Sequence, residues 1–449
     1  MNEHLEDLIK RIANQIGSIE RRDRKRKAQD QFHFLHGIEH LLIQLWKGTR
    51  IHEGYEGGIN KRAGWYSEHP QYRNPNLTFK QTMAAYDGLI ALRLIQETRG
   101  GYFNRETLEG GITKFVATDE LLSMLSEINE DPFVVIKPNP DAQCIIMRDE
   151  FEGHKKQVPY LETPAVKEMR DNLCLINRCL SEHYPDIRIK DEDWAPLQKR
   201  IMADPDKRPI DLTRHNLVRI FSDGRFDRGG RFYRGWWQNV PSEYRRYITI
   251  DGKRTNEYDY SQLNPHMVYF LREKELGSED AYSRVFDGEH RDLVKEAFNA
   301  MIQADKPLNQ KPRDIDLSEV EFGWQYLKQA ILDAHKPIED MFFKGHGNYL
   351  QYVDSIMAED VMLKFVKAEF APVLPVHDSF IMHYAYGDLG ELEEEMRRAF
   401  HGHFKRDIKV KEEIGVMLPS SFDGKDWDEL TFEEKVHGPP EYSGWESRN

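Results

Sequence analysis

Apolar residues in the first part of the chain recur with the period of a helix. Leu5, Ile9 and Ile12 are three or four positions apart, which puts them on one helical face. A basic run at residues 21–27 separates this pattern from a second amphipathic stretch. We therefore expect an N-terminal helical region over residues 1–55. The basic run fits a solvated helix face, and a contact with phosphate is the alternative.

Residues 56–130 have a different pattern, in which a helix is followed by a hairpin. The apolar spacing of residues 77–96 predicts the helix. Glycine pairs at 100–101 and 110–111 then bracket a β-prone stretch, as expected of a hairpin whose tip turns sharply. A second, short helix follows Thr118, a residue type that suits an N-cap.

Helix, hairpin and helix in this order resemble a winged-helix module, in which the hairpin contacts the phosphates of nucleic acid. Arg105 and Lys114 would supply positive charge to this wing. A small structural α/β unit and a protein-binding winged helix are the alternatives. The resemblance therefore predicts a contact with DNA or RNA and leaves both alternatives open.

Residues 131–212 mix short β-prone stretches with helical ones. Strand patterns at 132–139 and 144–149 precede an amphipathic helical pattern at 166–184. Two prolines within residues 202–213 then indicate a boundary. We expect a helical connector or a thumb-like region in this part of the chain.

Composition narrows the class of protein. Hydrophobic residues make up 39% of the 449 residues and aromatic residues 11%, which excludes a largely disordered chain. The length suggests about two to four folded units. Three cysteines without a CxxC pair exclude a disulfide framework and indicate a reduced, cytoplasmic protein. No apolar run approaches the roughly 18 residues of a membrane span, so no membrane partner is expected.

The distribution of charge says more than the net value of −14. Residues 421–449 predict an acidic tail, whereas residues 213–254 hold ten Arg or Lys residues against four acids. The same basic stretch contains eight aromatic residues, among them Tyr233, Trp236 and Trp237. Arginine neutralises phosphate and aromatic rings stack on bases, so this mixture predicts a nucleic-acid-binding platform. A pair of core strands with exposed arginines is the alternative.

Two aspartates far apart in the sequence suggest a metal centre. Asp259 ends a β-prone segment just before an expected helix. Asp378 follows His377 at the turn between two apolar strands. Within one sheet, these segments would bring the two carboxylates side by side. Carboxylate oxygen is the ligand that Mg²⁺ prefers, and two such ions would activate a hydroxyl and neutralise a leaving pyrophosphate.

A helix predicted at residues 290–305 lies between these aspartates in the sequence. Arg291 and Lys295 are four positions apart and project from one helical face. Paired cations of this kind hold a triphosphate, although they also occur on ordinary solvated surfaces. Their location between the two aspartates favours the functional interpretation.

The order of these motifs resembles that of family A DNA polymerases and the related phage-type single-subunit RNA polymerases. The resemblance covers about residues 213–418. It implies an α+β fold with a right-hand polymerase core over residues 213–420, in which an antiparallel palm sheet carries helical fingers. The motifs are Asp227-x-x-Gly230-Arg231, Asp259-Tyr260-Ser261-Gln262, Arg291-x3-Lys295 and His377-Asp378.

The resemblance also implies a role for each matched residue. Asp259 and Asp378 would bind two Mg²⁺ ions, for which Mn²⁺ can substitute, with the backbone carbonyl of Tyr260 as a further ligand. Arg291 and Lys295 would hold the phosphates of a nucleoside triphosphate, and Lys295 would protonate the pyrophosphate. The remaining implied contacts are with the nucleotide for Asn264 and Gln303, and with primer or template for Arg231, His377, Asp227, Tyr233 and Gln238.

Three positions depart from the pattern of the DNA enzymes. Asn264 stands where those enzymes usually carry a glutamate that excludes the ribose 2′-hydroxyl, Gln303 replaces a tyrosine, and Ser379 replaces a third acid. The choice between dNTPs and rNTPs, and between DNA and RNA as product, is therefore open. We expect a polymerase that adds nucleotides to a 3′-hydroxyl with two metal ions, directed by a template. A template-independent nucleotidyltransferase and a winged-helix binding protein with an inactive polymerase-like domain are the alternatives, and a nuclease is a weaker one.

Overall fold

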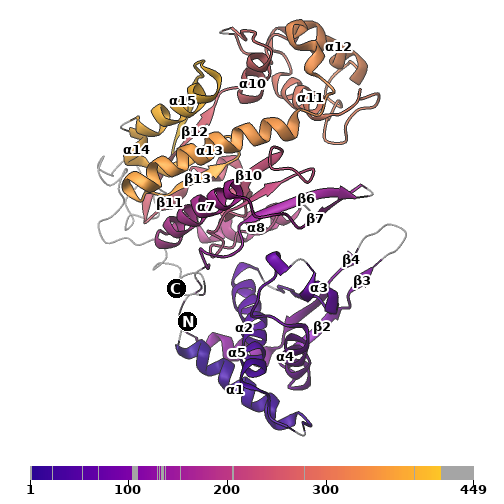
Figure 1. The fold of residues 1–449 in the computed structure, drawn as a ribbon, viewed down its shortest axis with the longest axis vertical. Helices are drawn as coiled ribbons and strands as arrows, with labels where there is room; N and C mark the ends of the chain where they lie inside the picture. The colour runs from indigo at the N-terminus through magenta and orange to yellow at the C-terminus, as the bar shows by residue number, and fades with distance from the viewer. Residues whose placement is uncertain are drawn as a thin grey trace.

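The computed structural model describes residues 3–415, except 23, 53, 69, 104–109, 129, 131, 133–135, 137, 152, 205–206, 278 and 389. In this part of the chain, helices pack on mostly antiparallel sheets, which agrees with the predicted α+β class (Figure 1). Two clusters of buried apolar residues divide the fold, one within residues 5–128 and one within residues 144–410. The described helices include none with the length and apolar character that crossing a membrane requires.

The first cluster lies inside a small unit of helices around one sheet. Its sheet has the strand order β1-β5-β2, and α2 packs against α4. The predicted helical face with Leu5, Ile9 and Ile12 is buried in this cluster. Residues on both sides of position 55 thus share one core. The elements are α1 (Glu3–Ile19), α2 (Ala28–Ile51), β1 (Gly57–Ile59), α3 (Ala63–Ser67), α4 (Phe79–Ala91), β2 (Ile95–Arg99), β5 (Thr113–Ala117) and α5 (Asp119–Ser126).

The hairpin that the glycine pairs predict is present in this unit. Beyond β2 and β5, the short strand β3 (Tyr102–Phe103) pairs with β4 (Gly110–Gly111). Lys114 lies in β5 opposite Gly58 of β1, at the base of the hairpin. Arg105 lies outside the described residues. The winged-helix interpretation and its contact with nucleic acid therefore stay predictions.

The second cluster begins with a sheet of strand order β10-β9-β6-β7. Strands β6 and β9 run parallel, and β10 runs antiparallel to β9. At one end of this sheet, β6 and β9 therefore begin and β10 ends. The elements of this region are β6 (Ile145–Phe151), β7 (His154–Gln157), α7 (Pro164–Glu182), α8 (Asp191–Met202), β9 (Val218–Phe221) and β10 (Gly229–Tyr233).

The sequence expectations for residues 131–212 are met in part. Helix α7 is the amphipathic helix expected at 166–184, and β6 is the second expected strand. Half of the strand expected at 132–139 lies outside the described residues. Apolar residues of this region share one buried cluster with residues beyond position 213, so the two regions form a continuous core.

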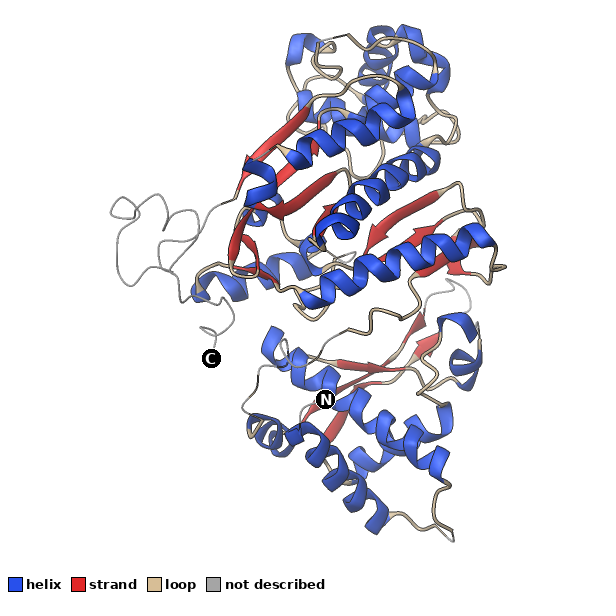
Figure 2. Ribbon diagram, turned by 60° about the vertical axis from the view of Figure 1, so that its left-hand side comes forward, coloured by secondary structure: helices blue, strands red, loops and turns tan. Residues whose placement is uncertain are grey.

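A third sheet has the strand order β13-β14-β12-β11-β8, with β15 paired to the other edge of β12. Long helices lie across the strands of both larger sheets (Figure 2). The strands are β8 (Pro185–Ile187), β11 (Ile248–Ile250), β12 (Lys253–Tyr260), β13 (Val373–Val376), β14 (Ser379–His383) and β15 (Val410–Ile414). The helices are α9 (Ser242–Arg245), α10 (Leu263–Leu271), α11 (Arg291–Gln303), α12 (Trp324–Ala334), α13 (Gly347–Glu369), α14 (Tyr384–Asp388) and α15 (Glu391–Phe404).

An ionic contact attaches helix α13 to the second sheet. Arg219 of β9 is only 1% exposed. Its Nη1 donates to Oε2 of Glu359 on α13 at 2.6 Å, and its Nη2 donates to Oγ of Ser355 at 3.0 Å. Its Nε donates to the carbonyl of Gly230 at 2.9 Å. Removing one partner would leave a buried charge without compensation, so this contact holds α13 on the sheet.

Trp236 and Trp237 belong to the core. Both side chains are fully buried, and Nε1 of Trp237 donates to the carbonyl of Pro375 in β13 at 3.0 Å. Buried rings have no free face on which a base could stack, so the predicted platform is wrong for these two residues. Their place in the core agrees with the alternative, but both residues lie in a short 3-10 helix, Trp236–Asn239, that follows β10, rather than in a strand.

We expect Arg219→Met to lower the free energy of unfolding by about 3 to 5 kcal/mol, because the carboxylate of Glu359, which is only 13% exposed, would lose its cation. Urea denaturation measures this loss. Arg397→Met on α15 is the matched control, since Arg397 pairs with Glu393 at an exposed site and such pairs contribute about 0 to 1 kcal/mol. Equal stability of the two variants would contradict an anchoring role for Arg219.

Candidate active site

The pairing of β12 with β14 brings Asp259 and Asp378 together. Asp259 lies opposite Ser379 in the antiparallel register, and Asp378 immediately precedes β14. The backbone N–H of Tyr260 points to the carbonyl of Asp378, with an N–O distance of 3.5 Å. Both predicted strands around the His377–Asp378 turn are present as β13 and β14. The two carboxylates are therefore neighbours at one end of the third sheet.

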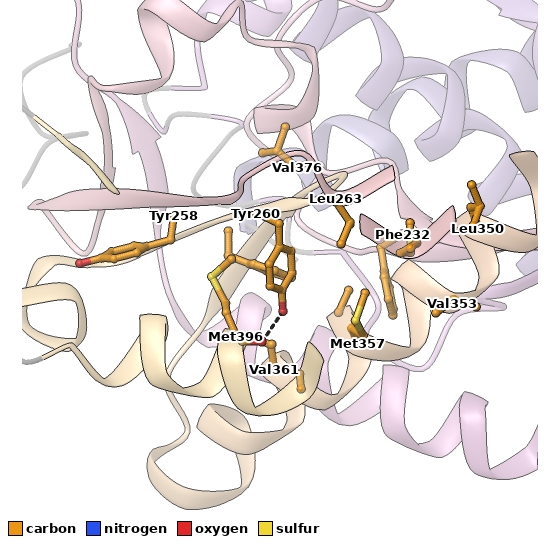
Figure 3. Packing of buried hydrophobic residues seen from close by; sticks show 14 of the residues in the cluster. Phe232, Tyr258, Tyr260, Leu263, Leu350, Val353, Met357, Val361, Val376 and Met396 are labelled. Atoms are coloured by element: carbon orange, nitrogen blue, oxygen red, sulfur yellow. Dashed lines mark hydrogen bonds between the residues drawn. The ribbon is translucent and has the colours of Figure 1, made fainter. Parts of the chain in front are cut away.

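The local backbone holds both aspartates in place. His377 adopts a φ of 58°, in the left-handed region, and the chain reverses from β13 to β14 within two residues. At the end of β12, the hydroxyl of Tyr260 donates to the carbonyl of Met396 on α15 at 2.6 Å (Figure 3). Because side chains alternate along a strand, this buried tyrosine directs Asp259 to the opposite face.

The electrostatic environment disfavours the ionised form of Asp259. Burial, followed by the negative charge of Asp378, raises the pKa of Asp259 to about 7, from an ordinary value of 3.8. Lys295 of α11 and Lys411 of β15 partly oppose this shift. A bound cation would remove the repulsion, so the pair is suited to a positively charged ligand.

Glu257 is a third carboxylate on the same face of β12, two positions before Asp259. Its carboxylate accepts from Nη2 of Arg245 at 2.8 Å and from Oγ of Ser379 at 2.6 Å. These partners neutralise and orient it, so it is less available to a metal than the two aspartates. The alternation of side chains along β12 was the signal that would have identified Glu257 from sequence.

Arg231 on β10 extends the site toward α13. Its Nε donates to Oδ2 of Asp354 at 2.6 Å, and Asp354 is buried. Burial raises the pKa of Asp354 to about 6, although the charge of Arg231 opposes the shift and Asp378 adds to it. Asp354 lay in a helical sequence without a motif, and only its contact with Arg231 identifies it. Tyr233 lies two residues beyond Arg231 on β10, and its side chain is half-buried.

His377 lies at the exposed end of the β13–β14 turn. Partial desolvation, followed by the positive charge of Arg231, lowers its pKa, while Asp378 opposes the change. These interactions place His377, Arg231 and Asp378 within one electrostatic group. The neutral imidazole is therefore favoured near neutral pH.

The first turns of α11 carry both predicted cations, Arg291 and Lys295. Nη2 of Arg291 donates to Oδ2 of Asp280 at 2.7 Å, and the guanidinium lies over the ring of Tyr282 at 5.3 Å. Desolvation works against ionisation of Asp280, but the hydrogen bond and charge of Arg291, together with hydrogen bonds from Ser283, lower its pKa. Lys295 is exposed one turn further along and acts on Asp259. The predicted helix thus faces the predicted carboxylates.

Asn264 joins α10 to α11 beside this cationic face. Its Nδ2 donates to Oδ1 of Asn299 at 2.9 Å. Asn299 also interacts with Tyr282, whose pKa is raised by burial first and by Asp378 second. Asn264, Asn299 and Tyr282 therefore form a polar group next to the aspartates. Sequence reasoning identified only the first of them, because the other two match no motif quoted above.

Three predicted residues lie away from this centre or are engaged elsewhere. Gln303 ends α11 and packs against Gly347, about 18 Å along the helix from Arg291 at 1.5 Å per residue. Nε2 of Gln238 donates to the carbonyls of Phe232 and Pro375 at 2.9 and 3.0 Å. Asp227 is exposed and pairs with Arg225 at 2.6 Å. Their contacts with nucleotide or nucleic acid remain predictions.

The donor set at the aspartate pair suits Mg²⁺ bound together with a substrate. Within the described residues, no group of three or more His, Cys, Asp or Glu side chains is placed to hold an ion. Mg²⁺ commonly uses one or two carboxylates and completes its shell with water and phosphate oxygens. Two neighbouring carboxylates that repel each other are compatible with this mode of binding.

Comparisons with known proteins add remote structural likeness. No protein-family model and no curated protein matches the chain. Among solved structures, the POL domain of Pol1 from M. smegmatis, in a complex with DNA primer-template and dNTP, is 14% identical with a TM-score of 0.31. The match covers 91% of this chain and 65% of that one. A likeness of this strength carries no activity over to the chain, so the function is argued from the site itself.

We expect Asp259→Asn to raise the free energy of unfolding of the divalent-free protein at pH 8 by about 1 to 2 kcal/mol, because it removes a disfavoured charge. The folded pKa of about 7 exceeds the ordinary 3.8, so the penalty is absent below about pH 4 and complete above about pH 7. The gain should therefore disappear as the pH falls. Urea denaturation in a chelator measures it, with Asp314→Asn, at an exposed position, as control. A destabilised variant at pH 8 would contradict the repulsion.

Proposed function

We propose that the protein is a nucleotidyltransferase that joins nucleotides to the 3′-hydroxyl of a nucleic acid strand under the direction of a template. The observation that carries this proposal is the side-by-side position of Asp259 and Asp378 at one sheet end, where Lys295 of α11 acts on Asp259. Carboxylates opposite Arg291 and Lys295 suit a substrate with a triphosphate. In this proposal the third sheet is the palm and α10 to α12 belong to the fingers.

Metal binding is part of the proposal. Asp259 and Asp378, with the backbone carbonyl of Tyr260, would hold Mg²⁺, for which Mn²⁺ can substitute. When bound, the metal would lower the pKa of the attacking hydroxyl and neutralise negative charge on the pyrophosphate. The raised pKa of Asp259 supports this assignment, since a cation would stabilise the ionised pair.

The cations of α11 would act on the triphosphate. The 3′-oxygen forms a bond to the α-phosphorus while the bond from that phosphorus to the pyrophosphate oxygen breaks. Arg291, held by Asp280 at 2.7 Å, would orient the β- and γ-phosphates. Lys295 would donate a proton to the departing pyrophosphate. Positioning and charge stabilisation would supply most of the rate enhancement.

Contacts with sugar and strand complete the proposal. Asn264 would lie near the sugar, where its bond with Asn299 orients its side chain. Arg231, Tyr233 and His377 would contact the primer or template, and Lys114 of the N-terminal unit would contact phosphates further away. Arg231 is already bound to Asp354 through Nε, which leaves its two Nη groups to serve a phosphate.

We expect the purified protein to extend a primed template with Mg²⁺ or Mn²⁺ and either dNTPs or rNTPs. Asp259→Asn and Asp378→Asn should each lower the rate by about 10³-fold or more, because each removes a charge that stabilises the transition state. Extension resolved on a sequencing gel measures this. Asp314→Asn is the control and should extend normally.

Other outcomes would redirect the assignment. Products whose sequence ignores the template would indicate a template-independent nucleotidyltransferase. Shortened primers would indicate a nuclease. No product with any nucleotide, in a protein that still binds nucleic acid, would overturn the proposal in favour of a binding protein with an inactive polymerase-like domain.

We also expect Asn264→Ala to change the ratio of kcat/KM for dNTPs and rNTPs, because this side chain would lie near the sugar. A change of about 10-fold corresponds to 1.4 kcal/mol, within the range of one hydrogen bond to a hydroxyl. Single-nucleotide incorporation with matched dNTP and rNTP pairs gives the ratio. Asn309→Ala, at an exposed position, should leave it unchanged. An unchanged ratio in Asn264→Ala would remove this residue from sugar selection.

A further inference from the structure

A cavity of about 280 Å³ lies at the end of the second sheet where β6 and β9 begin and β10 ends. Its walls come from separate parts of the chain. Lys47 reaches it from α2 of the N-terminal unit, and Asn177 from α7. Thr213 and Arg214 precede β9, and Arg234 follows β10. The cavity is therefore formed between the N-terminal unit and the core, and none of the roles discussed so far uses it.

Positive charge gathers at this cavity. Arg214 and Arg234 line it, and Arg208 and Arg148 lie close enough to act on them. Burial lowers the pKa of Arg214 and of Arg234, and the positive charge of neighbouring arginines lowers it further. None of these four guanidinium groups forms an ion pair with a residue in the described part of the chain.

One acid lies nearby and is already engaged. Asp211 accepts from Nζ of Lys47 at 2.9 Å and from Oγ1 and the backbone N–H of Thr213 at 2.6 and 3.1 Å. It therefore neutralises Lys47 and attracts Arg214 only from outside contact distance. Among the described residues, these four arginines thus have no bonded counter-charge.

The contrast with other arginines of the core is informative. Arg219, Arg231 and Arg245 each have a carboxylate partner, at 2.6, 2.6 and 2.8 Å. Arg214 is half-buried and Arg234 is exposed. Neighbouring guanidinium groups repel one another, and an anion bound between them would remove this repulsion. An external anion that binds beside Arg214 and Arg234 would thus stabilise the folded protein.

We propose that this cavity, called here the arginine pocket and defined by Lys47, Thr213, Arg214 and Arg234, binds a phosphate monoester. The planar fork of arginine matches the oxygens of phosphate, and a terminal phosphate carries more charge than a phosphodiester. The volume is near the lower end of ligand pockets, roughly 300 to 1,000 Å³, which suits one phosphate and its sugar. The monoester comes from the 5′ end of a nucleic acid strand or from a free nucleotide.

The location connects the pocket with the candidate active site. Arg234 directly follows β10 and is three residues beyond Arg231, a separation of at most roughly 10 Å at 3.3 Å per residue. A strand with its 5′-phosphate in the pocket would therefore begin close to the side chain that contacts Asp354. The inference does not require the transfer reaction, because binding is measured without turnover.

The test uses the full-length protein and two single-stranded oligonucleotides that carry a fluorophore at the 3′ end and differ only in a 5′-phosphate or 5′-hydroxyl. Fluorescence anisotropy should show at least 10-fold tighter binding of the phosphorylated strand. Arg214→Ala with Arg234→Ala should remove this preference. The control, Arg397→Ala with Arg406→Ala, loses two exposed arginines and should keep it. Arg234→Gln, at an exposed position, tests the same preference if the double variant misfolds.

A parallel titration with adenosine 5′-monophosphate, followed by calorimetry, distinguishes the two sources. Equal binding of both strands, together with monophosphate binding that the double variant loses, would assign the pocket to a free nucleotide. Absence of both a strand preference and monophosphate binding in the unmodified protein would overturn the proposal. A preference that persists in the double variant would also overturn it, because the phosphate would then bind elsewhere.

Discussion

Burial of side chains fixes the register in which β12 pairs with β14, because a slip of one residue would turn every buried side chain of the strands to the opposite face. Tyr258, Tyr260 and Phe380 are buried in the observed register. Asp259, between the two tyrosines, must then point to the other face, where Asp378 emerges from the β13–β14 turn. The apolar core of the third sheet thus determines where two like charges meet.

The proximity of these two negative charges is unfavourable by itself, and nearby lysines partly offset the repulsion. Burial and Asp378 raise the pKa of Asp259 to about 7, while Lys295 and Lys411 oppose the shift from two different elements. Glu257, by contrast, is neutralised by Arg245. The aspartate pair is therefore the part of the face whose charge is least satisfied by the protein, and this makes it the place where an external cation would stabilise the fold.

The same distinction between paired and unpaired charge applies to the arginines. Helix α13 supplies Asp354 and Glu359 to Arg231 and Arg219, and these pairs attach the helix to two neighbouring strands of the second sheet. Arg214 and Arg234 lie at the end of the second sheet and have no carboxylate partner in the described part of the chain. One set of arginines stabilises the fold, and the other leaves a site for an anion.

Local pattern was sufficient to predict the strand before Asp259, the hairpin around His377 and Asp378, and the helix that begins at Arg291, because periodicity and turn residues act over a few positions. It did not identify Asp354 or the pairing of Arg219 with Glu359, which lies 140 positions away. It also left open whether Trp236 and Trp237 stack on bases or fill a core. Burial and ion pairing depend on contacts between distant segments, so only the tertiary structure decided which charges of this acidic chain are satisfied internally and which remain available to ligands.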